Sequence, residues 1–475
     1  MSDDLRVECE HAEHCGGCPV IALPYGEQLA LKRGKVVGAV ARYAALELVY
    51  TDPVAPAEPV TGYRTRAKLM VGPSGAIGLY AKGGGHVVVD VPRCRVLSPL
   101  LGRVADEVRA SLARGGLEKP DGRPPWSLRS VDLREVDDGA ARRALVTFVV
   151  HAPDDVEQAA LDRLRAEAER LRAAVPDVIG VAVNFHDGES VQVLGSETRL
   201  LAGEARAVDR VGASAHVATF GSFVQAHRGQ AGRVHGFVGE ALRAAGPSPR
   251  VLDLYGGSGA IALSMAAAGA RVHLVESFAP AVHSALEAAR VAGVALTAEA
   301  ADAATALRAM VERGERFDVA VVNPPRRGTS PLAREWLARL APERVVYVSC
   351  DPETLARDLD HLGRLGWAVS WLRPVDMIPL TDEVETVALL RRAPAPRPRV
   401  HFEDEELIVV EKGPHEPTSP QGEYALSLLD RVRKLAPNAT PVHRLDPGAS
   451  GVVVFVKRPE ALAAWQRAWS ARSAR

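Results

Sequence analysis

The chain has 475 residues, of which 47% are hydrophobic and 25% charged, and its net charge is −1. These values are typical of a folded globular protein with two or three domains, each large enough for its own core. They exclude a globally basic nucleic-acid-binding protein, so an RNA partner would have to be held by a local basic surface. The sequence has no apolar run of 18 residues and no signal-peptide pattern, which predicts a cytoplasmic protein without membrane association.

The cysteines predict one four-thiolate site and one separate reactive thiol. The first group consists of Cys9, Cys15, Cys18 and Cys94. Gly16 and Gly17 let the backbone wrap tightly, so that two of these thiolates can point at one centre. Four thiolates suit an iron–sulfur cluster or structural zinc, and His11 and His14 would allow a zinc site without Cys94.

Basic residues recur in two predicted strands of a strand-rich region over residues 55–212. The stretches 62–69 and 127–134 both alternate cations with other residues. Each stretch alone is typical of a solvated strand face. Together they predict a surface that faces RNA.

A βαβ unit follows the strand-rich region. The apolar strand 250–255 leads into Gly256-Gly257-Ser258-Gly259, then a helix from Ala260, then a strand that ends in Glu276. This pattern places a glycine loop at a helix N-terminus and an acid at the tip of the second strand, where a ribose diol binds. The glycine spacing loosely meets the dinucleotide fingerprint, so an NAD enzyme is an alternative.

A polar loop after the strand 317–322 favours a methyltransferase over a dehydrogenase. The loop reads Asn323-Pro324-Pro325-Arg326. Two prolines after a polar residue make it rigid, which suits the binding of a planar base by fixed carbonyls.

Cys350 follows the apolar strand 345–349 and precedes a helix expected from Glu353. The thiol would lie at the carboxyl end of a strand in an α/β sheet, where chemistry usually occurs. We expect the helix N-terminus to favour the thiolate, although a small buried structural cysteine is an alternative. Glu385 opens the last apolar strand, 386–390. A Pro/Arg linker and a strand pattern from Val400 come next.

These motifs closely resemble the RNA (uracil-5-)-methyltransferases that use adenosylmethionine. The resemblance covers Cys9 to Leu390 and also includes the phrases 222–225, 349–354 and 376–379. It implies an α/β fold: a Rossmann-like class I methyltransferase sheet with an N-terminal iron–sulfur segment, a strand-rich central domain and a partial α+β C-terminal segment. The implied domains are 1–48 (cluster segment), 49–212 (RNA-facing), 213–393 (methyltransferase), 394–400 (linker) and 401–475 (C-terminal segment).

The resemblance also implies the chemistry. Cys350 would add to C6 of uracil and thereby activate C5, and Glu385 would remove the C5 proton. The implied adenosylmethionine contacts are Gln225, Tyr255, Glu276, Asp302 and Asn323. The implied ligands of a 4Fe-4S cluster are Cys9, Cys15, Cys18 and Cys94. Relatives often carry Asp at the position of Asn323 and His at the position of Glu383.

The tail is similar to the beginning of pseudouridine synthases that act on large RNAs, with Asp446 at the position of the nucleophile. We expect its sheet and core to be incomplete, as in a truncated gene fusion. The resulting prediction is a monomeric methyltransferase of RNA, with 23S rRNA as the first choice. The alternatives are a tRNA substrate, a second pseudouridine synthase activity, an exocyclic-amino methyltransferase, or an inert iron–sulfur RNA-binding scaffold.

Overall fold

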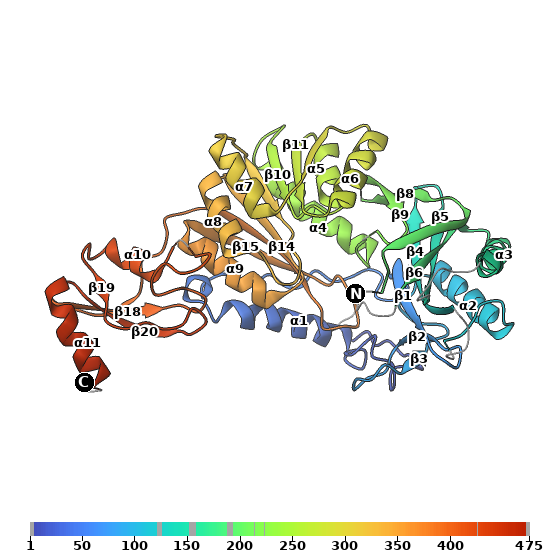
Figure 1. Cartoon of the computed structure of the whole chain (residues 1–475), viewed down its shortest axis with the longest axis horizontal. Helices are drawn as coiled ribbons and strands as arrows, with labels where there is room; N and C mark the ends of the chain where they lie inside the picture. Colours follow the sequence, from blue (N-terminus) through green and yellow to red (C-terminus); the bar gives the residue numbers. More distant parts are fainter. Residues whose placement is uncertain are drawn as a thin grey trace.

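The computed structural model describes residues 4–120, 126–151, 158–187, 193–212, 214–222, 224–424 and 426–471. In this part of the chain a strand-rich sheet lies at one end, an α/β sheet in the middle and a small sheet with the C-terminus at the other end (Figure 1). No helix in these ranges has the length and apolar character needed to cross a lipid bilayer.

The central α/β sheet has the order β12-β11-β10-β13-β14-β16-β15, and its first five strands are parallel. β16 runs antiparallel to both of its neighbours. The strands are β10 (Arg250–Leu254), β11 (Arg271–Glu276), β12 (Leu296–Ala300), β13 (Val319–Val322), β14 (Arg344–Ser349), β15 (Trp367–Val375) and β16 (Glu385–Arg392). The mostly parallel α/β sheet that the sequence predicts is therefore confirmed.

Helices cover both faces of this sheet because its central strands are apolar on both sides. In β10, Val251 packs into one core and Leu252 into the other. One face carries α4 (Arg228–Arg243), α5 (Ala260–Ala267) and α6 (Ala279–Ala292). The other carries α7 (Ala303–Glu312), α8 (Pro331–Leu340) and α9 (Pro352–Arg364).

The strand-rich sheet has the order β3-β2-β1-β4-β5-β6-β7. Its strands are β1 (Arg66–Val71), β2 (Ile77–Tyr80), β3 (Val88–Asp90), β4 (Ser127–Asp137), β5 (Arg142–His151), β6 (Val178–His186) and β7 (Glu197–Gly203). Helices α2 (Pro99–Ala113) and α3 (Gln158–Ala174) pack on it through one apolar core. A separate hairpin of β8 (Arg206–Val211) and β9 (Ser214–Thr219) leads to the α/β sheet, and residue 213, the predicted domain boundary, lies outside the described residues.

The N-terminal segment is attached to the α/β sheet rather than separate from it. Helix α1 (Tyr25–Val40) contributes Ala39 and Val40 to the apolar core beneath the sheet. Lys32 forms a fully buried ion pair with Asp376, and the Tyr25 hydroxyl donates to the same carboxylate at 2.6 Å. This helix thereby holds the loop that leads to Glu385.

The C-terminal segment folds into a four-stranded sheet with the order β17-β18-β20-β19. Its elements are β17 (Val400–Glu403), β18 (Leu407–Lys412), α10 (Leu428–Arg433), β19 (Thr440–Pro441), β20 (Gly451–Val456) and α11 (Leu462–Ser470). Ile408, Val410 and Phe455 are fully buried in an apolar cluster of its own, whereas Val400, Phe402 and Val452 are exposed, as the expected incomplete core would leave them. The segment docks on α8 and α9, where the Arg364 guanidinium donates to the main-chain oxygen of His415 at 3.4 Å.

Candidate active site

Cys350 and Glu385 lie at the same edge of the α/β sheet. The β14–β16 pairing ends at Ser349 and Thr386, so Cys350 and Glu385 come one step beyond the last pair. Asp351 then caps α9, with its carboxylate accepting from the Thr354 amide at 2.8 Å. The fold therefore brings the predicted nucleophile and the predicted base together at the carboxyl end of β14.

Two cavities meet at this edge. The first, of about 440 Å3, lies against the glycine loop, and we call it the glycine-loop cavity. Its lining includes Gln225, Asp253, Tyr255, Gly257, Ser258 and Asn323. The second, of about 470 Å3, is lined by Arg64, Arg66 and Lys68 of the strand-rich domain, and we call it the basic cavity. Val224, Gln225, Arg326, Cys350 and Glu385 line both.

The glycine loop is shaped to leave room for a ligand. Gly257 and Gly259 have φ values of 53° and 85°, in the left-handed region that favours glycine. A Cβ on Gly257 would meet no atom within 4 Å, so this part of the loop faces open space. Asp253, near the end of β10, is fully buried at the cavity; the Ala262 amide is close enough to lower its pKa, but neither carboxyl oxygen has a partner of good hydrogen-bond geometry among the described residues.

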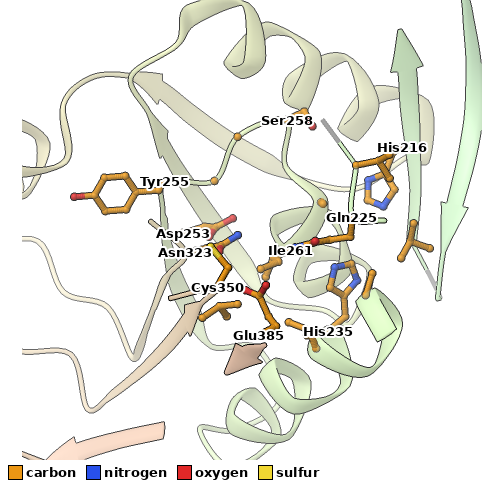
Figure 2. A pocket seen from close by; sticks show the side chains of 18 of the residues that line it. His216, Gln225, His235, Asp253, Tyr255, Ser258, Ile261, Asn323, Cys350 and Glu385 are labelled. Carbon is orange, nitrogen blue, oxygen red and sulfur yellow. The ribbon is translucent and has the colours of Figure 1, made fainter. Parts of the chain in front are cut away.

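Three of the five predicted cofactor contacts line the glycine-loop cavity: Gln225, Tyr255 and Asn323. In Figure 2, Asn323 lies beside Asp253 and Cys350, whereas the Tyr255 ring points away from them. Glu276 is not part of this lining. Its carboxylate accepts a hydrogen bond from the Gly257 amide at 3.1 Å and so stabilises the glycine loop.

Asp302 also lies outside the lining of the glycine-loop cavity. It caps α7, where its carboxylate accepts from the Ala304 amide at 2.9 Å. Phe223, which precedes Gln225 in its sequence motif by two positions, lies outside the described residues.

The polar side chains of the glycine-loop cavity that were not predicted as site residues include His216, His235 and Asp253. Loss of solvation lowers the pKa of both histidines to about 4, so both are neutral at pH 7. Within the part of the chain that the structure describes, the Nδ1 atom of His235 has no hydrogen-bond partner. A carboxylate within the apolar strand 250–255 was a signal for Asp253, but nothing local in the sequence marks the two histidines.

The environment of Cys350 does not favour the thiolate, and this expectation was wrong. Burial raises the pKa of the Cys350 thiol, the Glu385 carboxylate raises it further, and Arg326 lowers it. Glu385 is 6% exposed, and burial raises its pKa to about 7 against the opposing effect of Arg326. The helix N-terminus at α9 is thus outweighed by desolvation and by a neighbouring acid.

Two of the cations expected to face RNA are neutralised by aspartates instead: Arg134 is buried, and Arg66 is half-buried at the edge of the basic cavity. Arg66 pairs with Asp132 at 2.9 Å and donates to the Ser222 main-chain oxygen at 2.7 Å. Arg134 pairs with Asp209 at 3.2 Å and also donates to Ser222. These guanidiniums hold the loop that carries Gln225. Arg64 and Lys68 remain as the less engaged cations of the basic cavity.

The four N-terminal cysteines lie near one another beside the basic cavity. Burial and the other three thiols raise the pKa of Cys18 to about 12. Cys9, Cys18 and Cys94 pack against an apolar cluster that includes Leu380, and Cys94 also lines the basic cavity. In the described part of the chain, no three His, Cys, Asp or Glu side chains are arranged to hold a single metal ion.

The chain resembles known RNA methyltransferases along most of its length. It is 33% identical over 388 residues to an uncharacterized RNA methyltransferase of Geobacter sulfurreducens, covering 80% of this chain and 76% of the relative. An uncharacterized RNA methyltransferase of Nitratidesulfovibrio vulgaris is 32% identical over 402 residues, covering 82% of this chain and 83% of the relative. Residues 215–393 match the family model described as tRNA (Uracil-5-)-methyltransferase.

A solved structure shares the fold. It is the tRNA (uracil-54, C5)-methyltransferase of Pyrococcus abyssi in complex with S-adenosyl-L-homocysteine, 24% identical, with a TM-score of 0.63 over 79% of this chain and 86% of that one. At this identity the likeness establishes the α/β methyltransferase fold. The sequence matches show that the chain belongs to the RNA uracil-5-methyltransferase family.

Proposed function

We propose that the protein methylates C5 of a specific uridine in RNA, with Cys350 as nucleophile and Glu385 as base. The observation that carries this proposal is that both residues line the glycine-loop cavity and the basic cavity at once. A methyl donor in one cavity and a target base in the other would therefore meet at these two side chains. The exocyclic-amino alternative requires neither residue, so their position argues against it.

The glycine-loop cavity fits adenosylmethionine. Its glycine loop leaves room for a ligand at Gly257, and the buried Asp253 carboxyl, which has no well-formed hydrogen bond among the described residues, could accept one from the ligand. Gln225, Tyr255 and Asn323 would hold the cofactor, and Glu276 would fix the loop beneath it. When bound, adenosylmethionine supplies an electrophilic methyl group.

The chemistry of the base follows from Cys350 and Glu385. C5 of uracil is a poor nucleophile, and addition of the Cys350 thiolate to C6 converts C5 into an enolate carbon. After C5 has been methylated, the Glu385 carboxylate takes the C5 proton, the C5–C6 double bond re-forms and the thiolate leaves. A uridine in a duplex must leave its stack to reach the thiol.

We further propose that the cysteine group Cys9, Cys15, Cys18 and Cys94 holds a 4Fe-4S cluster. Four neighbouring thiols in a largely apolar shell suit the donor set of such a cluster. The packing against Leu380 suggests a role in ordering the loop before Glu385 and the nearby basic cavity. The cluster would then support RNA binding rather than the chemical step.

The choice of RNA has two candidates. We favour 23S rRNA from the resemblance of the cysteine pattern to cluster-bearing relatives that act on it. A tRNA substrate is favoured by the description of the family model that matches residues 215–393.

The test uses anaerobically purified protein, adenosylmethionine and transcripts of both RNA classes that contain 5-fluorouridine. Fluorine at C5 cannot leave as a proton, so a C5 methyltransferase should stall as a covalent protein–RNA adduct. We expect an adduct that requires adenosylmethionine and disappears in Cys350→Ala, and the crosslinked nucleotide identifies the target. An adduct that ignores adenosylmethionine but is lost in Asp446→Ala would instead indicate a pseudouridine synthase, and no adduct on either RNA would refute C5 methylation.

A further inference from the structure

The rim of the basic cavity presents a hydrogen-bond donor and an acceptor side by side. Arg326 Nη2 donates to Glu383 Oε2 at 2.7 Å. Their side chains are 66% and 37% exposed, so both groups are accessible to a ligand. Both line the basic cavity together with Cys350 and Glu385. The pair is therefore available to bind whatever enters this cavity.

Hydrogen bonds to neighbouring threonines fix the backbone positions of Arg326 and Glu383. The Arg326 carbonyl oxygen accepts from Thr354 Oγ1 at 2.9 Å, at the beginning of α9. The Glu383 amide donates to Thr381 Oγ1 at 3.3 Å. The pair thus bridges two anchored loops, one after β13 and one before β16. A rigid support of this kind is what selective recognition needs, because a loosely held pair could adapt to the wrong ligand.

The pair also lies close to the reacting groups. Arg326 lowers the pKa of both Cys350 and Glu385, and Glu383 raises the pKa of both. A base that places C6 at Cys350 and C5 at Glu385 therefore comes within reach of Arg326 and Glu383. Among the described residues that line the basic cavity, the only carboxylates are Glu383 and Glu385. Since Glu385 is assigned to C5, Glu383 is the carboxylate that remains for recognition.

The edge of uracil matches this pair. Next to C5 lies O4, which accepts a hydrogen bond, and then N3–H, which donates one. A guanidinium donates and a carboxylate accepts, so the pair supplies one donor for O4 and one acceptor for N3–H. Cytosine carries an amino donor and an unprotonated nitrogen acceptor at these positions. Its amino group would face the guanidinium, which is also a donor, and its N3 would face the carboxylate, which is also an acceptor. A site built around hydrogen bonds rejects such an analogue strongly, because its polar groups are left unpaired.

We propose that Arg326 and Glu383 read the O4 and N3–H edge of the target pyrimidine and so select uracil over cytosine. This inference rests on the proposed function, since it requires a base that is oriented by Cys350 and Glu385. It assigns Glu383 a role in specificity that is separate from proton transfer.

The experiment compares covalent adduct formation by the full-length protein on two transcripts with adenosylmethionine present. One transcript carries 5-fluorouridine at the crosslinked position, and the other has that position changed to 5-fluorocytidine. We expect the natural protein to react with the first and hardly with the second. In Glu383→Gln the amide can donate to cytosine N3, so the preference should fall about ten- to a hundred-fold, as for the loss of a charged hydrogen bond.

Two further variants complete the test. Glu383→Ala should slow the reaction with 5-fluorouridine without improving that with 5-fluorocytidine. Asp382→Asn is the matched control, because Asp382 pairs with Lys35 and does not line the basic cavity, and its preference should be unchanged. An unchanged preference in Glu383→Gln, with normal reaction on 5-fluorouridine, overturns the inference alone. Absence of any adduct with the natural protein would overturn the proposed function and this inference with it.

Discussion

The carboxylate of Glu385 raises the pKa of the Cys350 thiol, which it faces across two neighbouring antiparallel strands. An ionised Glu385 therefore makes ionisation of the Cys350 thiol more costly. Arg326, at the rim of the basic cavity, is the cation that lowers the pKa of both. The reactivity of the thiol is therefore set by its burial and by charges from two separate segments, the loop after β13 and the segment that leads into β16.

Replacing Glu385 by Gln removes the anion that disfavours the thiolate. We expect the midpoint of the pH dependence of Cys350 alkylation to move to lower pH. Methylation should fall by about 10²- to 10⁴-fold because the C5 proton loses its base, and the covalent RNA adduct should accumulate. Alkylation mass spectrometry and gel-shift of the adduct measure both effects. Glu353→Gln, an exposed carboxylate paired with Arg42, should change neither.

The methylation rate should rise with pH through about 7, because Glu385 acts as a base only when ionised and its pKa lies at about 7. Arg326→Gln removes the cation that lowers this pKa, so the rise should move to higher pH. Single-turnover rates with saturating RNA measure the shift. A pH profile that does not move in Arg326→Gln would contradict this assignment of Arg326.

Asp253 should make the folded protein less stable as pH rises. Burial raises the pKa of Asp253 to about 7, so the folded state keeps a proton that the unfolded chain loses near the ordinary value of 3.8. The free energy of unfolding should therefore decrease between about pH 4 and pH 7, by about 4 kcal/mol from this group. Asp253→Asn should make the pH dependence of denaturant unfolding shallower, and an unchanged slope would contradict the predicted shift.

Each of the substitutions Cys9→Ser, Cys15→Ser, Cys18→Ser and Cys94→Ser should reduce iron and sulfide content after anaerobic reconstitution. Cys350→Ser is the matched control and should retain both, because this thiol is not part of the group. Elemental analysis and the visible absorption spectrum give the readout without any assay of methylation. Binding of zinc in place of iron by the natural protein would favour the structural-zinc alternative.

Glu416→Ala should weaken the docking of the C-terminal segment on α9. Glu416 is 2% exposed and pairs with Arg431 at 2.6 Å, next to Arg364 of α9. Removing one partner of a buried ion pair leaves uncompensated charge and costs about 3–5 kcal/mol. We expect a lower unfolding midpoint in denaturant and faster hydrogen exchange in α9. The exposed Glu405→Ala should change neither quantity.

Much of the α/β sheet could be predicted, because its strands are short apolar runs that end in recognisable polar loops. The glycine loop, the Asn323 loop and the Cys350 turn all fall at the carboxyl edge of the sheet, as expected. Topology then follows from the general rules for βαβ units, which is why Cys350 could be placed at this edge, whereas Gln225 was assigned only through the family resemblance.

Contacts between distant segments were the part that the sequence could not provide. Arg66 and Arg134 alternate along strands as solvated cations would, and only the structure shows that Asp132 and Asp209 neutralise them beneath the Gln225 loop. The direction of the Cys350 pKa shift was also mistaken, because desolvation depends on burial rather than on neighbours in the chain. The apolar core of the C-terminal segment likewise depends on the pairing of β18 with β20. The spacing of apolar residues along the sequence does not determine that pairing.

The wall formed by Val224, Gln225, Arg326, Cys350 and Glu385 belongs to both cavities, and this has a kinetic consequence. Both substrates must occupy the protein together for the reacting atoms to meet at that wall. Steady-state rates should therefore follow a sequential mechanism, with reciprocal plots that intersect rather than run parallel. Binding of a ligand in one cavity should also change the affinity of the other cavity for its ligand. Thermodynamic linkage requires this factor to be the same in both directions.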